Sequence, residues 1–222
     1  MRLKSAVPEA RVRLVFLGAA GVGKTALIRR FLHDSFEARH RCTVEELHVL
    51  ELELELEPPG RAALRLRLEL LDTSGSYSFP AMRRLCMRHG DAFVLVYSAH
   101  EPGSFEEVRR LRDEILEARP GAVPLLVVAN KTDLGPAPGA GEAAARLPAV
   151  VQREWGVRHV EASAKQGHNV PQLFQQLLGQ ISPLRGRLSP ALRRRSNPDS
   201  LPKEPPTASR RRPLKAPSCT IC

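Results

Sequence analysis

The sequence lacks any long apolar run. None of its hydrophobic stretches approaches the roughly 20 residues that a membrane-spanning helix needs. The first residues include Arg2 and Lys4 but no apolar segment behind them, which is unlike a signal peptide. We therefore expect neither a spanning helix nor export, and a chain that is made and kept in the cytosol.

Cysteine is also scarce, with four residues among 222. Cys42 and Cys86 stand far apart in the body of the chain, and Cys219 and Cys222 lie at its end. This spacing forms no disulfide framework, which excludes the small cross-linked domains of oxidising compartments. We interpret Cys42 and Cys86 as ordinary reduced thiols.

Large apolar residues are few in the last part of the chain, where positive charge is concentrated. Residues 182–222 contain eight Arg, two Lys and eight Pro against Asp199 and Glu204, and so carry +8 of the net charge of +10. Such a segment cannot offset its ordering entropy by burial and is predicted to be disordered. We divide the chain into an N-terminal extension (1–10), one folded domain (11–181) and a basic, Pro-rich tail (182–222).

A glycine-rich turn near the start of the folded domain carries the first chemical signal. Residues 18–25, reading GAAGVGKT, follow an apolar strand-like run and precede an amphipathic helix pattern. This order matches the phosphate-binding loop GxxxxGKT, in which backbone N–H groups surround phosphates, the Lys adds charge and the Thr hydroxyl binds magnesium. We predict that a nucleoside triphosphate is bound by Gly18, Ala19, Ala20, Gly21, Val22, Gly23, Lys24, Thr25 and Ala26.

Strand and helix patterns alternate along the folded domain. Strands are expected near residues 12–17, 47–57, 62–71, 92–97, 123–129 and 158–161. Helices are expected at 24–33, 104–118 with Ser104 as N-cap, 143–155 and 170–181. The pattern predicts an α/β fold, namely a three-layer α/β/α P-loop NTPase domain with a mostly parallel six-stranded sheet and one antiparallel edge strand.

A charged hairpin is predicted early in the domain. Residues 51–57 alternate Glu with Leu, residues 64–68 alternate Leu with Arg, and Pro-Pro-Gly lies between them. A turn centred on Pro59 would place Glu57 opposite Arg61, Glu53 opposite Arg65 and Glu51 opposite Arg67. We favour a solvated structural ribbon over a binding site for a basic partner or a cation, because the arginines neutralise the glutamates.

Two polar motifs follow predicted strands, at the edge where such sheets bind their ligands. Asn130, Lys131 and Asp133 belong to the motif NKTD, and Ser163, Ala164 and Lys165 form the motif SAK. The carboxylate of Asp133 can accept hydrogen bonds from the N1–H and the exocyclic amine of guanine, which adenine does not offer. With these motifs in this order, the chain resembles the Ras-type small GTPases over about residues 11–181.

The resemblance implies a role for each residue of the base site. Asn130 and Asp133 would recognise guanine, and Lys131 would pack along the plane of the base. Ala164, within the Ser163 to Lys165 motif, would offer its N–H to the guanine oxygen, and Phe36 would stack near the other edge.

The same resemblance implies a sensor for the γ-phosphate. Asp72 and Gly75, in DTSG, resemble the DxxG segment, in which Asp72 would hold Mg²⁺ through water and the Gly75 N–H would reach the γ-phosphate. Thr43 resembles the first switch threonine and, with Thr25, would close on the metal. Loss of the γ-phosphate would then release both loops and any effector docked on Thr43, Val44, Glu45 and Glu46. The residues implied in hydrolysis are Lys24, Thr43, Gly75 and Ser76.

The chain departs from the family pattern at positions that bear on mechanism. Ser76 stands where most members carry a Gln, and its hydroxyl is too short to orient the attacking water unaided. Ala20 replaces a glycine, and its Cβ crowds the space that an activating protein's arginine would enter. His40 and Cys42 replace a Tyr and a Pro of the first switch. We therefore predict slow hydrolysis and weak activation in trans.

Two further segments refine the interpretation. Residues 79–85, reading FPAMRRL, resemble the dexamethasone-induced Ras and striatal Ras homologue branch. The last four residues, CTIC, read as a prenylation box with an unusual final residue, and the basic tail supplies the second signal that such anchors need. We expect lipidation at Cys219 and attachment to the cytoplasmic face of the plasma membrane, with a cytosolic pool. A chance CxxC, a metal or redox pair, and a tail for nucleic acid are the alternatives.

The sequence thus predicts a membrane-anchored switch that binds GTP or GDP with Mg²⁺ and hydrolyses GTP slowly. A module that holds GTP almost permanently and works by docking effectors is the alternative, and the base motifs argue against a small-molecule kinase or ATPase. Expected partners are effectors at the switch regions, exchange factors, activating proteins and an anionic membrane surface. A monomer is expected, with no nucleic-acid partner.

Overall fold

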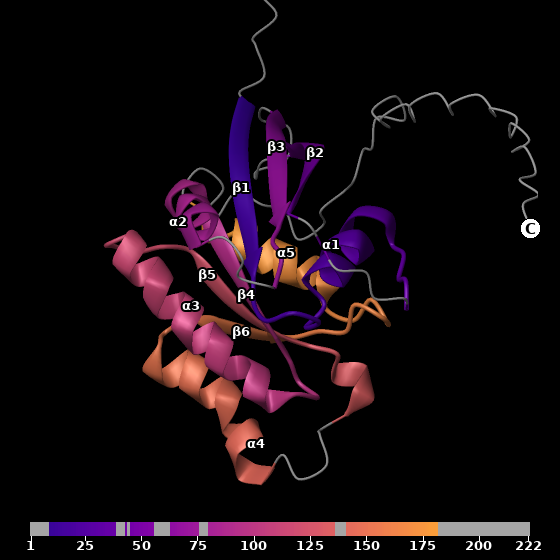
Figure 1. Cartoon of the computed structure of the whole chain (residues 1–222). Helices are drawn as coiled ribbons and strands as arrows, with labels where there is room; N and C mark the ends of the chain where they lie inside the picture. Colours follow the sequence, from indigo (N-terminus) through magenta and orange to yellow (C-terminus); the bar gives the residue numbers. More distant parts are fainter. Residues whose placement is uncertain are drawn as a thin grey trace, which may run out of the picture.

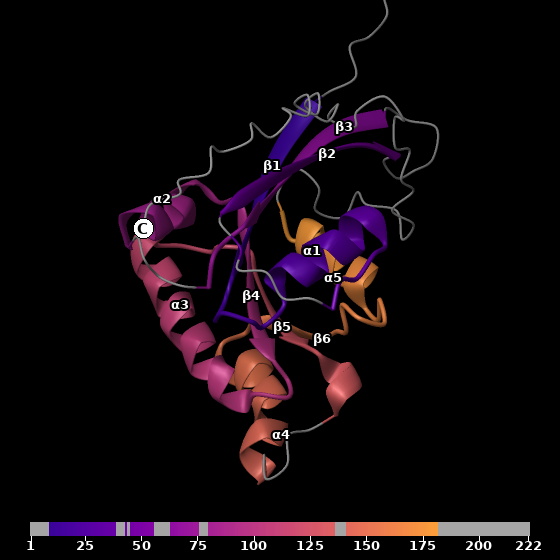
Figure 2. The same cartoon turned by 45° about the vertical axis from the view of Figure 1, so that its right-hand side comes forward.

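The computed structural model describes residues 9–38, 43, 45–55, 63–75, 80–135 and 141–181. These residues form a six-stranded sheet of order β2-β3-β1-β4-β5-β6 (Figures 1 and 2). Only β2 and β3 pair antiparallel, while the other neighbouring pairs are parallel. The strands are β1 (Glu9–Leu17), β2 (Glu46–Glu55), β3 (Ala63–Asp72), β4 (Ala92–Ser98), β5 (Leu125–Asn130) and β6 (Arg158–Glu161).

Helices cover both faces of the sheet. They are α1 (Lys24–His33), α2 (Pro80–His89), α3 (Phe105–Ala118), α4 (Gly141–Ala149) and α5 (Val170–Leu178), with short 3₁₀ helices at Pro102–Ser104 and Thr132–Leu134. One core cluster joins α1 and α5 to the sheet, and the other joins α2 and α3 to its opposite face. The predicted three-layer α/β/α fold, with a mostly parallel sheet and one antiparallel edge strand, is confirmed.

Alternation of side chains along the strands divides the core between these two layers. In β1, Leu14 and Phe16 face the α1 and α5 side, whereas Val15 and Leu17 face the α2 and α3 side. Successive residues of a strand point to opposite faces, so a strand covered on both sides must be apolar throughout. Every residue of β4 and β5 is buried, as expected for central strands.

The charged hairpin has the predicted register. Glu51 lies opposite Arg67 and Glu53 opposite Arg65, and β2 is the edge strand. Glu57, Arg61 and the turn at Pro59 lie outside the described residues. Among the described side chains, Arg67 pairs with the buried Glu69 of its own strand, at 3.5 Å from Nε to Oε1. The same Glu69 carboxylate also binds the Arg13 guanidinium of β1 at 2.7 Å.

Helix α2 was not expected from the sequence. Its buried residues are Cys86 and Met87, whereas Met82 and Leu85 are about half exposed, at 47% and 50%. Burial raises the pKa of the Cys86 thiol above its usual value. The helix contains Arg83, Arg84, Arg88 and His89 among its ten residues, so it is polar on average. Proline at its first position suits a helix start.

Two predicted helix boundaries were wrong, and one predicted cap differs in its bonding. Ser104 is the N-cap position of α3, as predicted, but its hydroxyl makes no capping bond and donates from Oγ to the Glu101 carbonyl at 2.6 Å, at the end of a 3₁₀ turn. Helix α4 gives way to a π-helical segment, Val150–Glu154, just after Pro148. Proline has no N–H for the helical ladder, which explains the break in regular α geometry. Helix α5 ends at Leu178 rather than at Ile181.

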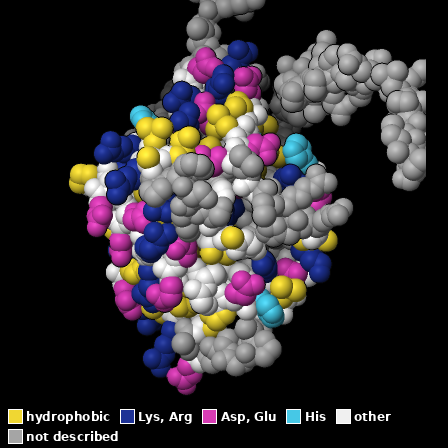
Figure 3. Space-filling view, in the orientation of Figure 1, with side chains coloured by type: hydrophobic (Ala, Val, Ile, Leu, Met, Phe, Trp, Pro, Cys, Tyr) yellow, Lys and Arg dark blue, Asp and Glu magenta, His cyan; other side chains and the backbone are white. Residues whose placement is uncertain are grey.

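The surface over α3 carries alternating charges (Figure 3). Arg109 pairs with Glu106 and Arg110 with Glu107, each one helical turn apart. Such solvated pairs favour solubility and contribute little stability. No helix formed by the described residues has the length and apolarity to cross a membrane.

Candidate nucleotide site

The glycine-rich loop joins the carboxyl end of β1 to the start of α1. A Cβ on Gly18 would lie 2.1 Å from the Val96 carbonyl oxygen, and one on Gly23 would lie 2.3 Å from the Asn130 Nδ2. Both glycines also have positive φ, at 144° and 97°. Only glycine fits these positions. No side chain caps the first turn of α1, so its N–H groups point to where an anion would be bound.

Lys24 is folded back over this loop. Its Nζ donates to the carbonyl oxygens of Gly18 at 2.8 Å and Ala19 at 2.9 Å, and only 6% of the residue is exposed. Burial lowers the pKa of Lys24 to about 8, and the charges of Asp72 and Glu107 oppose that shift. A buried ammonium at the start of a helix favours a phosphate group nearby, which would restore the charged form.

Three side-chain oxygens meet beside the loop. The Thr25 hydroxyl donates to the Asp72 Oδ2 at 2.6 Å and lies 2.7 Å from the Thr43 hydroxyl. Asp72 is completely buried, and its Oδ1 has no hydrogen-bond partner among the described residues. Burial raises the pKa of this carboxyl. A carboxylate and two hydroxyls on one spot fit a hard cation such as Mg²⁺, which prefers oxygen ligands.

The segment after Asp72 is anchored to the loop. Thr73 donates from its hydroxyl to the Phe16 carbonyl at 2.6 Å, at the end of β1. Gly75 approaches the loop so closely that a Cβ there would lie 2.4 Å from both the Cα and the N of Ala20. The structure thus places Ala20, one departure from the family pattern, against Gly75, the residue just before Ser76, which is another departure. Ser76 itself lies outside the described residues.

At the far end of the site, Asn130 links two loops. Its Nδ2 donates to the Val22 carbonyl at 2.9 Å, and its Oδ1 accepts the Ala164 N–H at 3.1 Å. The residue is 1% exposed. Both polar atoms therefore bind protein groups, so Asn130 joins the phosphate-binding loop to the SAK segment. The Ala164 N–H that the resemblance assigned to guanine would have to be shared with Asn130.

Asp133 is held in place by the SAK segment. Its Oδ1 accepts from the Ser163 hydroxyl at 2.6 Å, and Lys165 Nζ lies 3.9 Å from Oδ2. The Ser163 hydroxyl in turn accepts the Gln166 N–H at 3.1 Å. A carboxylate fixed in this way presents its remaining lone pairs in one direction, as recognition of two adjacent N–H groups requires.

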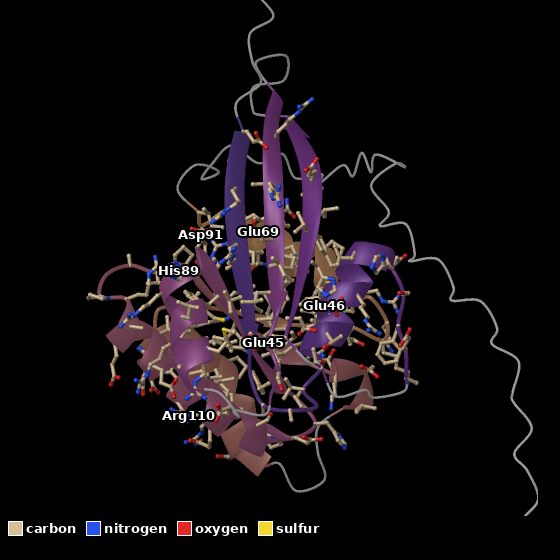
Figure 4. All side chains as sticks on the ribbon, turned by 45° about the horizontal axis from the view of Figure 1, so that its top comes forward. Glu45, Glu46, Glu69, His89, Asp91 and Arg110 are labelled. Carbon is tan, nitrogen blue, oxygen red and sulfur yellow. The ribbon has the colours of Figure 1, made fainter. Side chains whose placement is uncertain are left out.

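The remaining predicted residues lie around these two ends. Lys131 has a left-handed backbone with a φ of 66°, and its Nζ is 3.9 Å from Glu101. Phe36 is 38% exposed, which leaves its ring accessible for stacking. Glu45 and Glu46 are exposed at the start of β2 (Figure 4). Val44, His40, Cys42, Cys219 and the tail lie outside the described residues.

Sequence reasoning missed Thr73 and Arg30. Thr73 was part of the DTSG motif but was given no role. Arg30, on α1, donates to the carbonyl of Ala164, 134 residues later in the chain. No local pattern in the sequence could have indicated that contact.

Comparison with known proteins agrees with this geometry. The Ras family model matches residues 13–183 of the chain. The chain is 34% identical over 197 residues to the GTP-binding protein Rhes of Homo sapiens, covering 82% of this chain and 69% of that protein. The Rhes proteins of Mus musculus and Rattus norvegicus are each 34% identical over 194 residues, covering 81% of this chain and 68% of theirs. The resemblance drawn from the sequence, including its branch, is confirmed.

Proposed function

Because this chain belongs to the Ras family, we propose that it is a guanine-nucleotide switch that binds GTP or GDP with Mg²⁺ and hydrolyses GTP slowly. One observation carries the proposal above the others. The Asn130 side chain joins Val22 of the glycine-rich loop to Ala164 of the SAK segment, which also binds Asp133. This supports a single site in which the loop would hold phosphates and Asp133 would recognise guanine.

The residues at the phosphate end would hold the nucleotide and its metal. Lys24 and the first turn of α1 would bind the phosphates, and Thr25, Thr43 and Asp72 would hold Mg²⁺, with Asp72 acting through water. The metal would neutralise charge on the phosphate oxygens during transfer to water. Thr43 and Gly75 would be drawn in by the γ-phosphate and released when it is lost.

The proposal of slow hydrolysis rests on two residues expected near the γ-phosphate, Ser76 and Ala20. Ser76 cannot orient water as a Gln does, and Ala20 adds a Cβ beside Gly75, where the two backbones already touch. This crowding would also weaken activation by a partner's arginine. A chain that never hydrolyses GTP and serves only as an effector-docking module is the second candidate, and the same two residues favour it.

Membrane attachment and partners complete the proposal. A lipid on Cys219 and the basic tail would hold the protein at the cytoplasmic face of the plasma membrane. Exposed Glu45 and Glu46 would contact effectors when GTP is bound, and exchange factors would reload the site.

The decisive experiment identifies the nucleotide that copurifies with the protein. Chromatography of the released nucleotide should give GTP or GDP at about one per chain, and guanine nucleotides should compete with a fluorescent GDP where ATP does not. Single-turnover conversion of bound GTP then separates the two candidates, because the docking module would show none. Equal binding of ATP and GTP would overturn the proposal.

A further inference from the structure

Arg30 on α1 is the most extensively hydrogen-bonded arginine near the base end of the site. Its Nε donates to the Ala164 carbonyl at 2.8 Å, and one terminal nitrogen donates to the Lys165 carbonyl at 2.6 Å. The other terminal nitrogen donates to the Asp34 carbonyl at 2.8 Å and reaches its carboxylate at 3.2 Å. Only 16% of the side chain is exposed. The guanidinium thus contacts two segments at once.

The end of α1 prepares this arrangement. Asp34 follows the helix in a left-handed conformation with a φ of 51°, and its N–H donates to the Arg30 carbonyl. The chain therefore turns back over Arg30, which brings the Asp34 carbonyl within reach of the same side chain. A planar guanidinium carries five donors in a fixed fork and so can bind carbonyls of separate segments in one plane, a geometry that the compact ammonium of a lysine does not supply. The Arg30 stem also lies near Gly167, where a Cβ would be 3.7 Å from its Cδ.

These contacts connect three parts of the proposed nucleotide site. Helix α1 begins with Lys24 and Thr25 at the phosphate end. Ala164 and Lys165 belong to the segment that orients Asp133 through Ser163. Asp34 lies two residues before Phe36, the predicted stacking residue. Both backbone polar groups of Ala164 are hydrogen-bonded, because Asn130 accepts from its N–H and Arg30 donates to its carbonyl.

We propose that Arg30 is a positioning residue that holds the Ala164 and Lys165 peptides against α1 and thereby slows release of the guanine nucleotide. The inference rests on the proposed function, since it assigns Arg30 a part in the same site. Arg30 makes no contact with the oxygens of Thr25, Thr43 or Asp72, so its effect falls on nucleotide retention rather than on the hydrolytic step. Without Arg30, two carbonyls lose charge-assisted hydrogen bonds and the base segment loses its outer support.

The neighbouring Arg29 provides a matched control. It lies on the same helix and pairs with Glu37 at 2.9 Å, but the two side chains are 36% and 60% exposed. Exposed pairs of this kind contribute little. Arg29→Ala removes the same charge and side chain from α1 without touching the base segment.

The experiment measures dissociation of fluorescent GDP in the presence of Mg²⁺ for Arg30→Ala, Arg30→Lys and Arg29→Ala in the full chain. Loss of the charge-assisted bonds should accelerate release about tenfold or more in Arg30→Ala. Arg30→Lys should be intermediate, since an ammonium can reach one of the two carbonyls. Arg29→Ala should stay within about twofold of the unsubstituted protein. Single-turnover hydrolysis of bound GTP should be unchanged in all three.

A second readout needs no nucleotide. Amide hydrogen exchange of residues 163–169 should become faster in Arg30→Ala than in Arg29→Ala, with protection of β4 and β5 retained. Equal exchange and equal GDP release in the two alanine variants would overturn the assignment. So would a common acceleration of release, hydrolysis and global exchange, which marks simple destabilisation. If the unsubstituted protein retains no guanine nucleotide, the proposed function fails, while the exchange comparison still decides whether Arg30 holds the segment.

Discussion

The two ends of the proposed nucleotide site differ in how far protein hydrogen bonds satisfy their polar groups. At the base end, Asn130, Asp133 and Ser163 bind one another's segments at 2.6 to 3.1 Å. At the phosphate end, Lys24 is bent onto its own loop, and Asp72 keeps one buried oxygen without a partner among the described residues.

The difference indicates a division of labour. In the proposed function, a preformed base end would select the nucleotide and lose little entropy on binding. The phosphate end carries buried charge that the protein alone stabilises poorly, so bound metal and phosphates would stabilise it. A switch needs both properties, because its nucleotide must stay bound while the γ-phosphate comes and goes.

The largest effect on the difference between the two ends is expected from a substitution at Lys24. Lys24→Ala removes the buried ammonium from the phosphates and should lower GDP affinity about a hundredfold or more, since several charged hydrogen bonds are lost together. Equilibrium titration with fluorescent GDP measures the loss, with Arg29→Ala as the control for charge on the same helix. An affinity drop below about threefold would show that the base end alone retains the nucleotide.

A substitution at Ser76 tests whether the phosphate end can change the rate of hydrolysis without changing nucleotide release. Ser76→Gln should raise single-turnover GTP hydrolysis about tenfold, because the longer amide can orient the attacking water. GDP dissociation should not change. Ala20→Gly serves as a companion variant, expected to help an activating protein more than the intrinsic rate. Unchanged hydrolysis in Ser76→Gln would contradict the role proposed for this position in slow hydrolysis.

The ionisation of Lys24, at the phosphate end, should make both GDP affinity and the free energy of unfolding depend on pH. Burial lowers the pKa of Lys24 to about 8. Nucleotide-free protein should therefore bind GDP about tenfold more weakly at pH 9 than at pH 7, because most of the ammonium is then neutral. The unfolded chain keeps its proton up to a pKa of 10.5. The free energy of unfolding of nucleotide-free protein should thus rise from about pH 8 to pH 10.5, as the buried charge is relieved. Lys24→Met should abolish both trends, and their persistence in that variant would assign them to another group.

The smallest effect is expected within the base end. Ser163→Ala leaves Asp133 without its short hydrogen bond and should weaken GDP binding about fivefold, with part of the preference over ATP lost. Lys165→Ala should have less effect, because its ammonium is 3.9 Å from Asp133 and its side chain is 61% exposed. Competition titrations with GDP and ATP compare the two variants. A larger loss from Lys165→Ala would mean that charge, rather than a fixed orientation, governs Asp133.

Much of this arrangement could be predicted from the sequence because each motif is local and lies at a strand end. Residues 18–25, 130–133 and 163–165 meet because the carboxyl ends of parallel strands share one edge of the sheet. The roles of Asn130 and Arg30 as links could not be predicted, since their partners lie more than a hundred residues away. Helix α2 escaped prediction for a different reason. It carries three arginines and a histidine among its ten residues, so the segment is polar on average.

The alkylation rate of the buried Cys86 thiol can report how often α2 moves away from the sheet. Thiol reagents attack the thiolate, and burial both shields this sulfur and raises its pKa. Alkylation of Cys86 at neutral pH should therefore proceed only when α2 lifts from the sheet. Its labelling rate, followed by peptide mass spectrometry with GDP and then with a GTP analogue bound, would report whether α2 moves between the two nucleotide states in the unsubstituted chain.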